Sequence, residues 1–469
     1  MSSPASPSPD RHAANSPAAR DIASVIHPYT NLKLHQEEGP LMIQRGEGIH
    51  VWDDEGKQYI EGMAGLWCAA LGFDNARLVD AATKAMQTLP FYHQFTHKSH
   101  MPGVELAEIL LDMAPVPMSK ALFANSGSEA NDTAIKLIWY YWNAMGKPEK
   151  KKIISRRRAY HGVTVASASL TGLPPNHMDF DLPIDRILHT SCPHHYFDAN
   201  AGESEEDFAT RCAEELEALI LEEGPDTIGG MFAEPIMGAG GVVVPPKGYF
   251  PKIQAVLKKY DILLVADEVI CGFHRTGNPW GSQTFDIEPD MLSMAKALSA
   301  SYLPISALLV NEKVWAAMVE ASARIGVFGH GYTYSGHPVA ASVAVETQKI
   351  YKETDIGAHV RSVQDRFQSR LRQFEGSDLV GEVRGVGLIA GVELIKDKAS
   401  HGKFDKGGVV GTMFRKHAEN HGLIVRNIVD AIALCPPLVI DDKGIDDLTD
   451  RFEAALEDTE AWVAANTPA

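Results

Sequence analysis

The chain lacks the features that mark several classes of protein. Among its 469 residues, 43 are Lys or Arg and 61 are Asp or Glu, which gives a formal net charge of -18. This sign disfavours nucleic acid as a partner, because binding a phosphate backbone requires basic side chains. No apolar run approaches the ~18–20 residues of a membrane-spanning helix. We therefore expect neither nucleic acid nor a membrane among its partners.

Cysteine is scarce, with five residues that form no Cys-x-x-Cys motif. An odd number of scattered cysteines in a long chain is typical of a reducing compartment. Cys192, His194 and His195 lie together, but no second pair of ligands follows at a useful spacing, so we expect no metal. Residues 1–20 are rich in Ser, Pro and Ala and lack the apolar core of a secretory signal. We expect a cytoplasmic protein with a disordered tail over residues 1–21.

The order of apolar and turn segments predicts an α/β fold. The strand candidates are KALFAN, KKIIS, TIGGMFAEP, ILLVADE, MLSMAK and SALLVN, and helical patterns separate them. Such alternation predicts a largely parallel sheet covered by helices. We expect this large domain to cover residues 78–330. Residues 22–77, with a hairpin turning at Asp54–Gly56, and residues 331–469 are expected to form a smaller α+β domain.

Lys296 is the only cation in the mostly apolar stretch Asp290–Val310. A lysine in such a place can extend its ammonium group to water while its stem stays on apolar surface. Alternatively, desolvation lowers the pKa of the amine, and the neutral amine attacks a carbonyl carbon to form an imine. The stretch by itself leaves both readings open.

A second motif is ALFANSGSEANDTAIKLIWYYW, in which a short strand leads through Ser126, Gly127 and Ser128 into a helix that starts near Glu129. Backbone N–H groups at a helix start can bind a phosphate, with help from the helix dipole and the serine hydroxyls. The same residues also satisfy a capping box, Ser126 with Glu129, which needs no ligand.

Further polar side chains follow two of the predicted strands. Asp267 stands at the carboxyl end of the strand Ile262–Ala266, and Tyr160 and His161 follow the strand KKIIS. In open α/β sheets, ligands bind beyond the carboxyl ends of the strands. Asp267 could pair with a protonated ring nitrogen or merely cap the next segment. Tyr160 could stack on a planar cofactor or simply pack.

Taken together, these motifs require a ligand with a phosphate, a flat ring with a basic nitrogen, and a carbonyl group for a lysine amine. Pyridoxal 5'-phosphate (PLP) has all three, and PLP sites pair a Schiff-base lysine with an acidic partner for the pyridinium nitrogen. The predicted cofactor is therefore PLP.

The chain also resembles a known family, the class III aminotransferases among the fold-type I PLP-dependent enzymes. Within that family it is most similar to the ω-amino-acid:pyruvate and amine:pyruvate transaminases. The resemblance covers roughly residues 27–440. It rests on GLWCAALG, NSGSEANDTAIK, YHGVTVASASLTG, EPIMGAGGV, LLVADEVICGFHRTG, MAKALSASYLPI and GHGYTYSGHP, which occur in the family's order. It implies a large domain with a mainly parallel seven-stranded sheet.

The resemblance also implies site residues. Lys296 would hold PLP as a Schiff base and act as the proton-transfer group, and Asp267 would bond the pyridine nitrogen. Tyr160 would stack on the ring, with Val269 behind it. The implied cofactor positions are completed by Ser126, Gly127, Ser128, His161, Glu234 and Thr333, and the implied substrate positions are Trp67, Phe95, Ala239 and Arg426.

Two of these positions carry wider implications. Arg426 matches a mobile arginine that binds a substrate carboxylate and swings away for uncharged amines. Thr333 matches a residue that reaches the phosphate of the neighbouring subunit, which implies a homodimer or higher assembly with shared sites. The chain departs from the family pattern at His274, where Gly is usual, and at Thr96, where a second Phe is frequent. The Thr96 difference bears on substrate preference.

The predicted function is a ping-pong, Schiff-base transamination from an amine or ω-amino acid to a keto acid, with pyruvate as the expected acceptor. An aminomutase or a decarboxylase on the same fold is the alternative. A mutase would need only one substrate, and a decarboxylase would release carbon dioxide. A non-enzymatic protein that stores PLP, or that PLP stabilises as a regulatory dimer, would show no exchange between alanine and pyruvate. Fold resemblance leaves the donor open.

Overall fold

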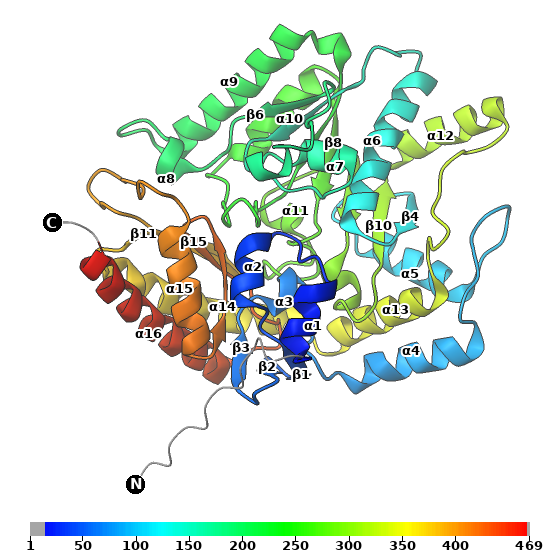
Figure 1. Cartoon of the computed structure of the whole chain (residues 1–469). Coiled ribbons are helices and arrows are strands. Elements are labelled where there is room, and N and C mark those ends of the chain that lie inside the picture. The colour runs from blue at the N-terminus through cyan, green and yellow to red at the C-terminus, as the bar shows by residue number, and fades with distance from the viewer. Residues whose placement is uncertain (1–14, 467–469) are drawn as a thin grey trace.

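A seven-stranded sheet forms the centre of the large lobe. The computed structural model of the chain describes residues 15–466 (Figure 1). The strand order is β4-β10-β9-β8-β7-β5-β6, and only β10 runs antiparallel to its neighbours. Their bounds are Lys120–Ala124 for β4, Lys152–Arg156 for β5, Ile187–Thr190 for β6, Ile228–Ala233 for β7, Leu263–Asp267 for β8, Met291–Met294 for β9 and Ser306–Val310 for β10.

This sheet confirms the predicted mainly parallel architecture and all six predicted strands. The seventh strand, β6, escaped prediction because it is short and two of its four residues, His189 and Thr190, are polar. Neighbouring residues of β8 point to opposite faces, as the period of a strand requires. Leu263 and Val265 pack in the cluster that contains the apolar face of α6, whereas Leu264 and Ala266 pack in the cluster that contains α10.

Helices therefore cover both faces of the sheet. The long helices of the large lobe are α4 (Ala76–Thr88), α5 (Met101–Asp112), α6 (Gly127–Ala144), α9 (Glu205–Glu223), α10 (Tyr249–Lys259) and α12 (Glu312–Ile325). Its short helical segments are α7 (Val165–Leu170), η1 (Pro174–Asn176), α8 (His195–Asp198), η2 (Pro225–Thr227), α11 (Gly281–Thr284) and η3 (Lys296–Ser299).

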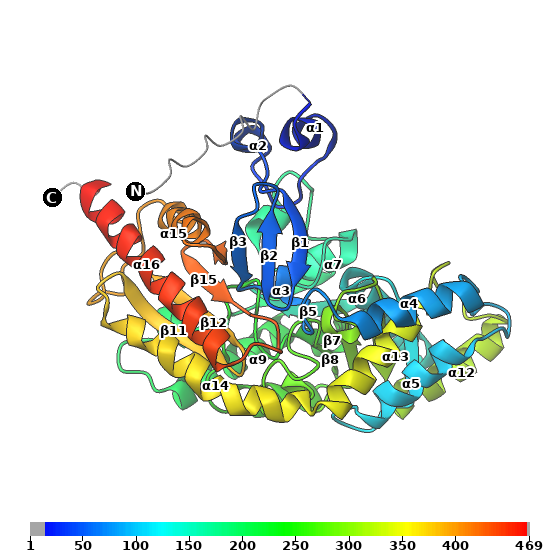
Figure 2. The same ribbon diagram turned by 90° about the horizontal axis from the view of Figure 1, so that it is seen from below.

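The smaller lobe is built from both ends of the chain (Figure 2). One sheet has the order β1-β2-β3-β13, with β1 Ile43–Glu47, β2 His50–Asp53, β3 Gln58–Glu61 and β13 Leu423–Ile424. The other has the order β11-β12-β15-β14, with β11 Val380–Val386, β12 Ile389–Leu394, β14 Arg426–Ile428 and β15 Ala431–Leu434. The predicted hairpin is the antiparallel pair β2 and β3. Short helix α3 is Ala64–Trp67, and the C-terminal helices are α14 (Ile356–Arg372), η4 (Gln373–Gly376), α15 (Val409–Asn420) and α16 (Asp442–Asn466).

The structure corrects the predicted tail at its C-terminal end. Residues 17–21 were expected to be disordered, but they belong to α1 (Pro17–Ser24). Ser16 caps this helix by accepting a hydrogen bond from the Ala19 N–H at 3.0 Å, and Pro17 occupies the first turn, where proline is favoured. A second short helix, α2 (Leu32–Glu38), follows, and the two lie side by side in both views (Figures 1 and 2). Residues 1–14 lie outside the described residues.

Helix α13 (Pro338–Glu353) was expected to belong to the smaller domain, but it packs against α4, α5 and η3 of the large lobe. Its buried face is unusually broad for a surface helix and includes Val339, Ala344 and Tyr351. The Tyr351 hydroxyl donates to the Ala297 carbonyl at 2.8 Å. A helix that is apolar on most sides must be covered on most sides, and the large lobe supplies most of that cover, with a smaller contact from α14.

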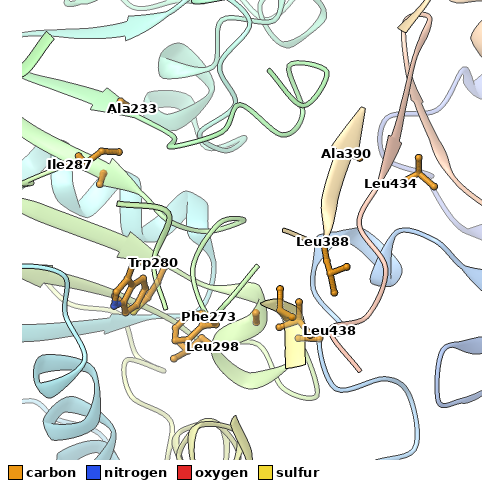
Figure 3. Packing of buried hydrophobic residues seen from close by; sticks show 14 of the residues in the cluster. Ala233, Phe273, Trp280, Ile287, Leu298, Leu388, Ala390, Leu434 and Leu438 are labelled. Atoms are coloured by element: carbon orange, nitrogen blue, oxygen red, sulfur yellow. The ribbon is translucent and has the colours of Figure 1, made fainter. Parts of the chain in front are cut away.

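One hydrophobic cluster joins the two lobes. Figure 3 shows Phe273, Trp280 and Leu298 of the large lobe on one side and Leu388 and Leu438 of the smaller lobe on the other, all members of that cluster. A shared apolar core of this kind fixes the two lobes relative to one another. Across the described residues, no helix is both long enough and apolar enough to cross a bilayer.

Trp280 provides a test of this core. Its side chain is fully buried, and its Nε1 donates to the Met113 carbonyl at 2.6 Å. Trp280→Phe keeps an aromatic ring but leaves that carbonyl without its partner, so we expect a loss of about 1–3 kcal/mol in the free energy of unfolding. Urea denaturation followed by circular dichroism measures it. Trp462→Phe, at a partly exposed position of α16, is the control; equal losses in both variants would contradict the account.

Candidate active site

A cavity of about 130 Å³ opens at the carboxyl ends of the central strands. Its walls come from the start of α6, the segments after β5, β7 and β8, and the segment that joins β9 to η3. The lining residues are Gly127, Ser128, Tyr160, His161, Glu234, Asp267, Val269, Ile270, Ala295 and Lys296. This is where an open α/β sheet places its ligands. Eight of the ten residues predicted to bind the cofactor lie in this lining, although they are up to 169 positions apart in the chain, from Gly127 to Lys296.

Asp267 forms the most constrained part of the cavity. It is only 4% exposed, and its Oδ2 accepts hydrogen bonds from Asn131 Nδ2 and His161 Nδ1, both at 2.8 Å. Its Oδ1 accepts from the Val269 N–H at 3.1 Å. Burial alone would raise the pKa of Asp267, but the bonds and charge of His161, together with Asn131 and Val269, bring that pKa below its ordinary value. The residue is therefore a buried carboxylate with acceptor capacity left on Oδ1.

Asn131 is a site residue that the sequence did not reveal. It lies on α6, one turn after Gly127, and is buried. The same Nδ2 also donates to the His161 carbonyl at 2.8 Å, so Asn131 ties the segment after β5 to the end of β8. The available signal was an amide on the otherwise apolar face of that helix, beside Ala134 and Ile135.

Lys296 begins η3, directly after β9, with its side chain in the cavity wall. Its φ of +49° is in the left-handed region, which is rare for residues other than glycine and is found at sites where the surroundings enforce it. Within residues 15–466, its Nζ makes no hydrogen bond or ion pair. Burial lowers the pKa of Lys296, against the opposing influence of Cys68 and Asp267. Both features describe an amine available for reaction.

At the start of α6, the structure shows the Ser126 half of the predicted capping box, and the phosphate-binding role of the turn stays a prediction. The Ser126 hydroxyl accepts from the Glu129 N–H at 3.2 Å, so it caps the helix, whereas Glu129 Oε2 reaches the Asn125 N–H at 2.6 Å. Gly127 and Ser128 lie in the cavity wall, and the first N–H groups of a helix have no partner within it. A Cβ on Gly127 would approach Val269 Cγ2 to 3.1 Å, so glycine lets the helix come close.

Glu234 and Tyr160 are two further residues of the cavity lining. Glu234 Oε1 accepts from the Tyr160 N–H at 3.1 Å. Burial raises the pKa of Glu234 to about 7, with Asp267 adding to the shift and His161 opposing it. Burial also raises the pKa of the Tyr160 hydroxyl, and Tyr29 adds to that shift. Tyr29 meets Tyr160 edge to face at 6.3 Å between ring centroids, and it too was not predicted.

Five other predicted residues lie outside this lining, and a sixth, Ser126, only caps α6. Trp67 and Ala239 are buried, and Trp67 belongs to an apolar cluster with Ile270 of the cavity wall. Arg426, on β14, has its guanidinium carbon 5.9 Å from the centre of the Tyr29 ring. Phe95 and Thr333 are both exposed. A Cβ on Gly331 would lie 3.1 Å from Phe95 Cζ, so Phe95 packs near the segment that carries Thr333.

The sequence matches the family described as Aminotransferase class-III over residues 33–456, and the chain belongs to that family. It is 49% identical to gamma aminobutyrate transaminase 1, mitochondrial, of Solanum lycopersicum, over 94% of this chain and 85% of that one. The solved ω-transaminase from Pseudomonas jessenii in complex with PMP is 55% identical with a TM-score of 0.95, covering 96% and 100% of the two chains. A solved transaminase with L-ala is 59% identical with a TM-score of 0.89, covering 90% and 100%.

Class III aminotransferases use PLP, and this cavity suits that cofactor. Asp267 Oδ1 can accept a hydrogen bond from a protonated ring nitrogen. The Lys296 amine has no hydrogen-bond or ion-pair partner in the described part of the chain, and the start of α6 offers N–H groups and the Ser128 hydroxyl for a phosphate. The fold class, the cofactor and the transaminase family predicted from the sequence are thereby confirmed.

The raised pKa of Glu234 makes a prediction for stability. The folded chain keeps a proton on Glu234 between pH 4.5 and about 7, where the unfolded chain has released it. Its contribution to stability is therefore complete below pH 4.5 and is lost as the pH rises through 7. Glu234→Gln should make the melting temperature of the apoprotein fall less steeply between pH 5 and 8.

The measurement is differential scanning fluorimetry of the apoprotein across that pH range. Glu457→Gln, at an exposed position of α16, is the matched control and should keep the wild-type slope. An unchanged slope in Glu234→Gln would show that this carboxyl titrates at its ordinary pKa.

Proposed function

We propose that this class III aminotransferase transfers the amino group of an amine or ω-amino acid to pyruvate. The observation that carries the proposal is the pairing of an unpartnered amine, Lys296, with a buried carboxylate, Asp267, in one cavity. Transamination needs both: a base that moves a proton at the substrate carbon and a group that keeps the ring nitrogen protonated. Bound PLP supplies the electron-withdrawing ring that makes the proton on that carbon acidic.

We assign the proton transfers to Lys296. With the cofactor bound, its Nζ would take the proton from the substrate carbon that bears the nitrogen and would later give that proton up again. The lowered pKa of Lys296, which burial causes, favours the neutral amine that accepts a proton. Asp267, fixed by His161 and Asn131, holds the ring nitrogen in its protonated form. Tyr160 and Val269, which both line the cavity, would pack against the ring.

Arg426 is proposed to select the carboxylate of the acceptor. It is half-buried beside Tyr29 and forms no ion pair within residues 15–466, so its guanidinium fork is available for a carboxylate. Burial lowers its pKa without removing its charge, and Tyr160 and Tyr29 oppose the shift. The solved relative with L-ala supports pyruvate as the acceptor, because alanine is the product of pyruvate amination. The gamma aminobutyrate transaminase relative supports ω-amino acids as donors.

We further propose that the enzyme is a homodimer or a higher assembly of the cytoplasm. Thr333 is exposed and lies outside the cavity of its own chain, as expected of a residue that serves a partner's phosphate. Large apolar side chains are exposed nearby, namely Tyr334 next to Thr333 in the sequence and Phe91, Tyr92 and Phe95 in another segment. The Phe91 ring contacts the Tyr334 ring, so the two segments lie together on the surface. All five cysteines are free, which suits a reducing compartment.

Lys296→Ala tests the central assignment. We expect the variant to lose the yellow absorbance of covalently held cofactor and to lose turnover by at least about 10²–10⁴-fold, the range that a general base contributes. Absorbance spectra and an alanine-formation assay with pyruvate measure both. Lys443→Ala, an exposed lysine on α16, is the control. Turnover close to that of the control would refute the assignment.

Arg426→Ala separates carboxylate recognition from chemistry. Loss of a hydrogen bond to a charged group costs about 1.5–3 kcal/mol, or roughly ten- to a hundredfold in binding. We expect kcat/KM for pyruvate to fall by that factor while an uncharged aldehyde acceptor is little affected. Steady-state kinetics with both acceptors decide the matter, with the exposed Arg372→Ala as a control. Equal losses for the two acceptors would exclude a carboxylate-binding role.

A further inference from the structure

Away from the cavity lining, three side chains converge between the first two helices. Asp21 of α1, His27 of the connecting segment and His35 of α2 bring their ligand atoms within 4.8 Å of one another. His27 Nε2 lies 2.7 Å from Asp21 Oδ1, and His35 Nε2 lies 3.2 Å from the same oxygen. The two imidazole rings face each other, with centroids 4.0 Å apart. Two imidazoles thus share one carboxylate oxygen.

The three side chains are largely buried, but one of them remains accessible to solvent, as expected of a site that an ion can enter. His35 is 8% exposed and Asp21 17%, whereas His27 is 29% exposed and lies on the open side. Four other charged side chains lie on these two helices, namely Arg20, Lys33, Glu37 and Glu38. Glu38 is bound to Lys416 at 2.6 Å and so is engaged elsewhere. Of the described residues, only this trio groups three histidine, cysteine or carboxylate ligands closely enough for one ion.

We propose that Asp21, His27 and His35 form a zinc site that holds α1 and α2 together. Two imidazole nitrogens and a carboxylate oxygen are a ligand set that zinc accepts, with water completing the coordination. Imidazole nitrogen favours zinc over magnesium or calcium, which prefer oxygen. Ligand bonds of ~2.0–2.1 Å in a tetrahedron place the ligand atoms ~3.3 Å apart. The Asp21–His35 separation of 3.2 Å is already close to that, whereas the exposed His27 ring has to turn and to lengthen its 2.7 Å contact with Asp21.

The site would fix a segment that reaches the active site. Tyr29 lies two residues after His27, in a left-handed conformation with φ +52°. Its hydroxyl accepts from Asn176 Nδ2 at 2.6 Å, its ring contacts Tyr160, and Arg426 lies over its face. A metal bound to residues on both sides of Tyr29 holds this segment against the large lobe. Zinc binding itself is independent of the proposed transaminase reaction.

The test measures zinc on the full-length, cofactor-loaded protein. After exposure to zinc chloride and gel filtration, metal analysis should find one zinc per chain above any background binding. The His27→Gln variant should not retain that zinc ion after gel filtration. Its affinity for zinc, measured by competition with a chromophoric chelator, should fall at least about a hundredfold, because even residues that only support a metal ligand contribute 10–100-fold. His35→Ala should do the same. Magnesium chloride should not compete.

Three further measurements keep the outcome clear. His421→Ala removes an exposed imidazole that pairs with a single carboxylate, Asp458, and should keep full zinc binding. His27→Gln changes the most exposed ligand, so the variant should fold, which circular dichroism checks. Zinc should raise the melting temperature of the wild type but not that of His27→Gln. If wild type and His27→Gln bind the same amount of zinc with the same affinity, the trio is only a hydrogen-bonded cluster and the proposal is wrong.

Discussion

The buried charge of Asp267 is the constraint on which the rest of the site depends. A carboxylate taken out of water is costly unless donors compensate it, and here three donors do so from three separate segments: Asn131 from α6, His161 from the segment after β5, and the Val269 N–H from the segment after β8. Each donor can reach Asp267 only if the segment that carries it lies at the carboxyl end of β8. The parallel order of β5, β7, β8 and β9 brings the ends together, and the bonds to Asp267 then tie these segments to one another.

The cavity keeps its ionisable groups in distinct states by giving each a different environment. Hydrogen bonds and charge keep the pKa of Asp267 low, whereas Glu234, buried without comparable donors, has its pKa raised to about 7. Lys296 sits among them with a lowered pKa. Titratable groups whose pKa values are moved apart in this way can take different roles in one cavity, one as a fixed charge and another as a proton carrier. The left-handed backbone at Lys296 is a further cost that the surrounding packing sustains.

Much of the fold could be predicted because its strands follow a simple apolar pattern, and the centre of the site could be predicted because charged residues interrupt that pattern. Buried parallel strands appear as continuous apolar runs, and Lys296 and Asp267 were visible as charges at the ends of such runs. Asn131 could not be predicted, because its partner Asp267 lies 136 residues later in the chain and only the fold brings the two side chains together. The α1 helix was hidden in a Ser- and Pro-rich segment, and Asp21, His27 and His35 have no recognisable spacing. The role proposed for Thr333 requires a second copy of the chain, so it follows from the family resemblance and not from the residues around Thr333 in this chain.

The central claim is that a buried negative charge on Asp267 keeps the cofactor's ring nitrogen protonated. The most direct test is the ¹⁵N chemical shift of that nitrogen in enzyme reconstituted with ¹⁵N-labelled PLP and titrated with base. The account predicts a protonated nitrogen throughout the neutral range and up to pH 9, with deprotonation at lower pH once Asn131→Ala removes one of the donors. A neutral ring nitrogen in the wild type at pH 7 would contradict it.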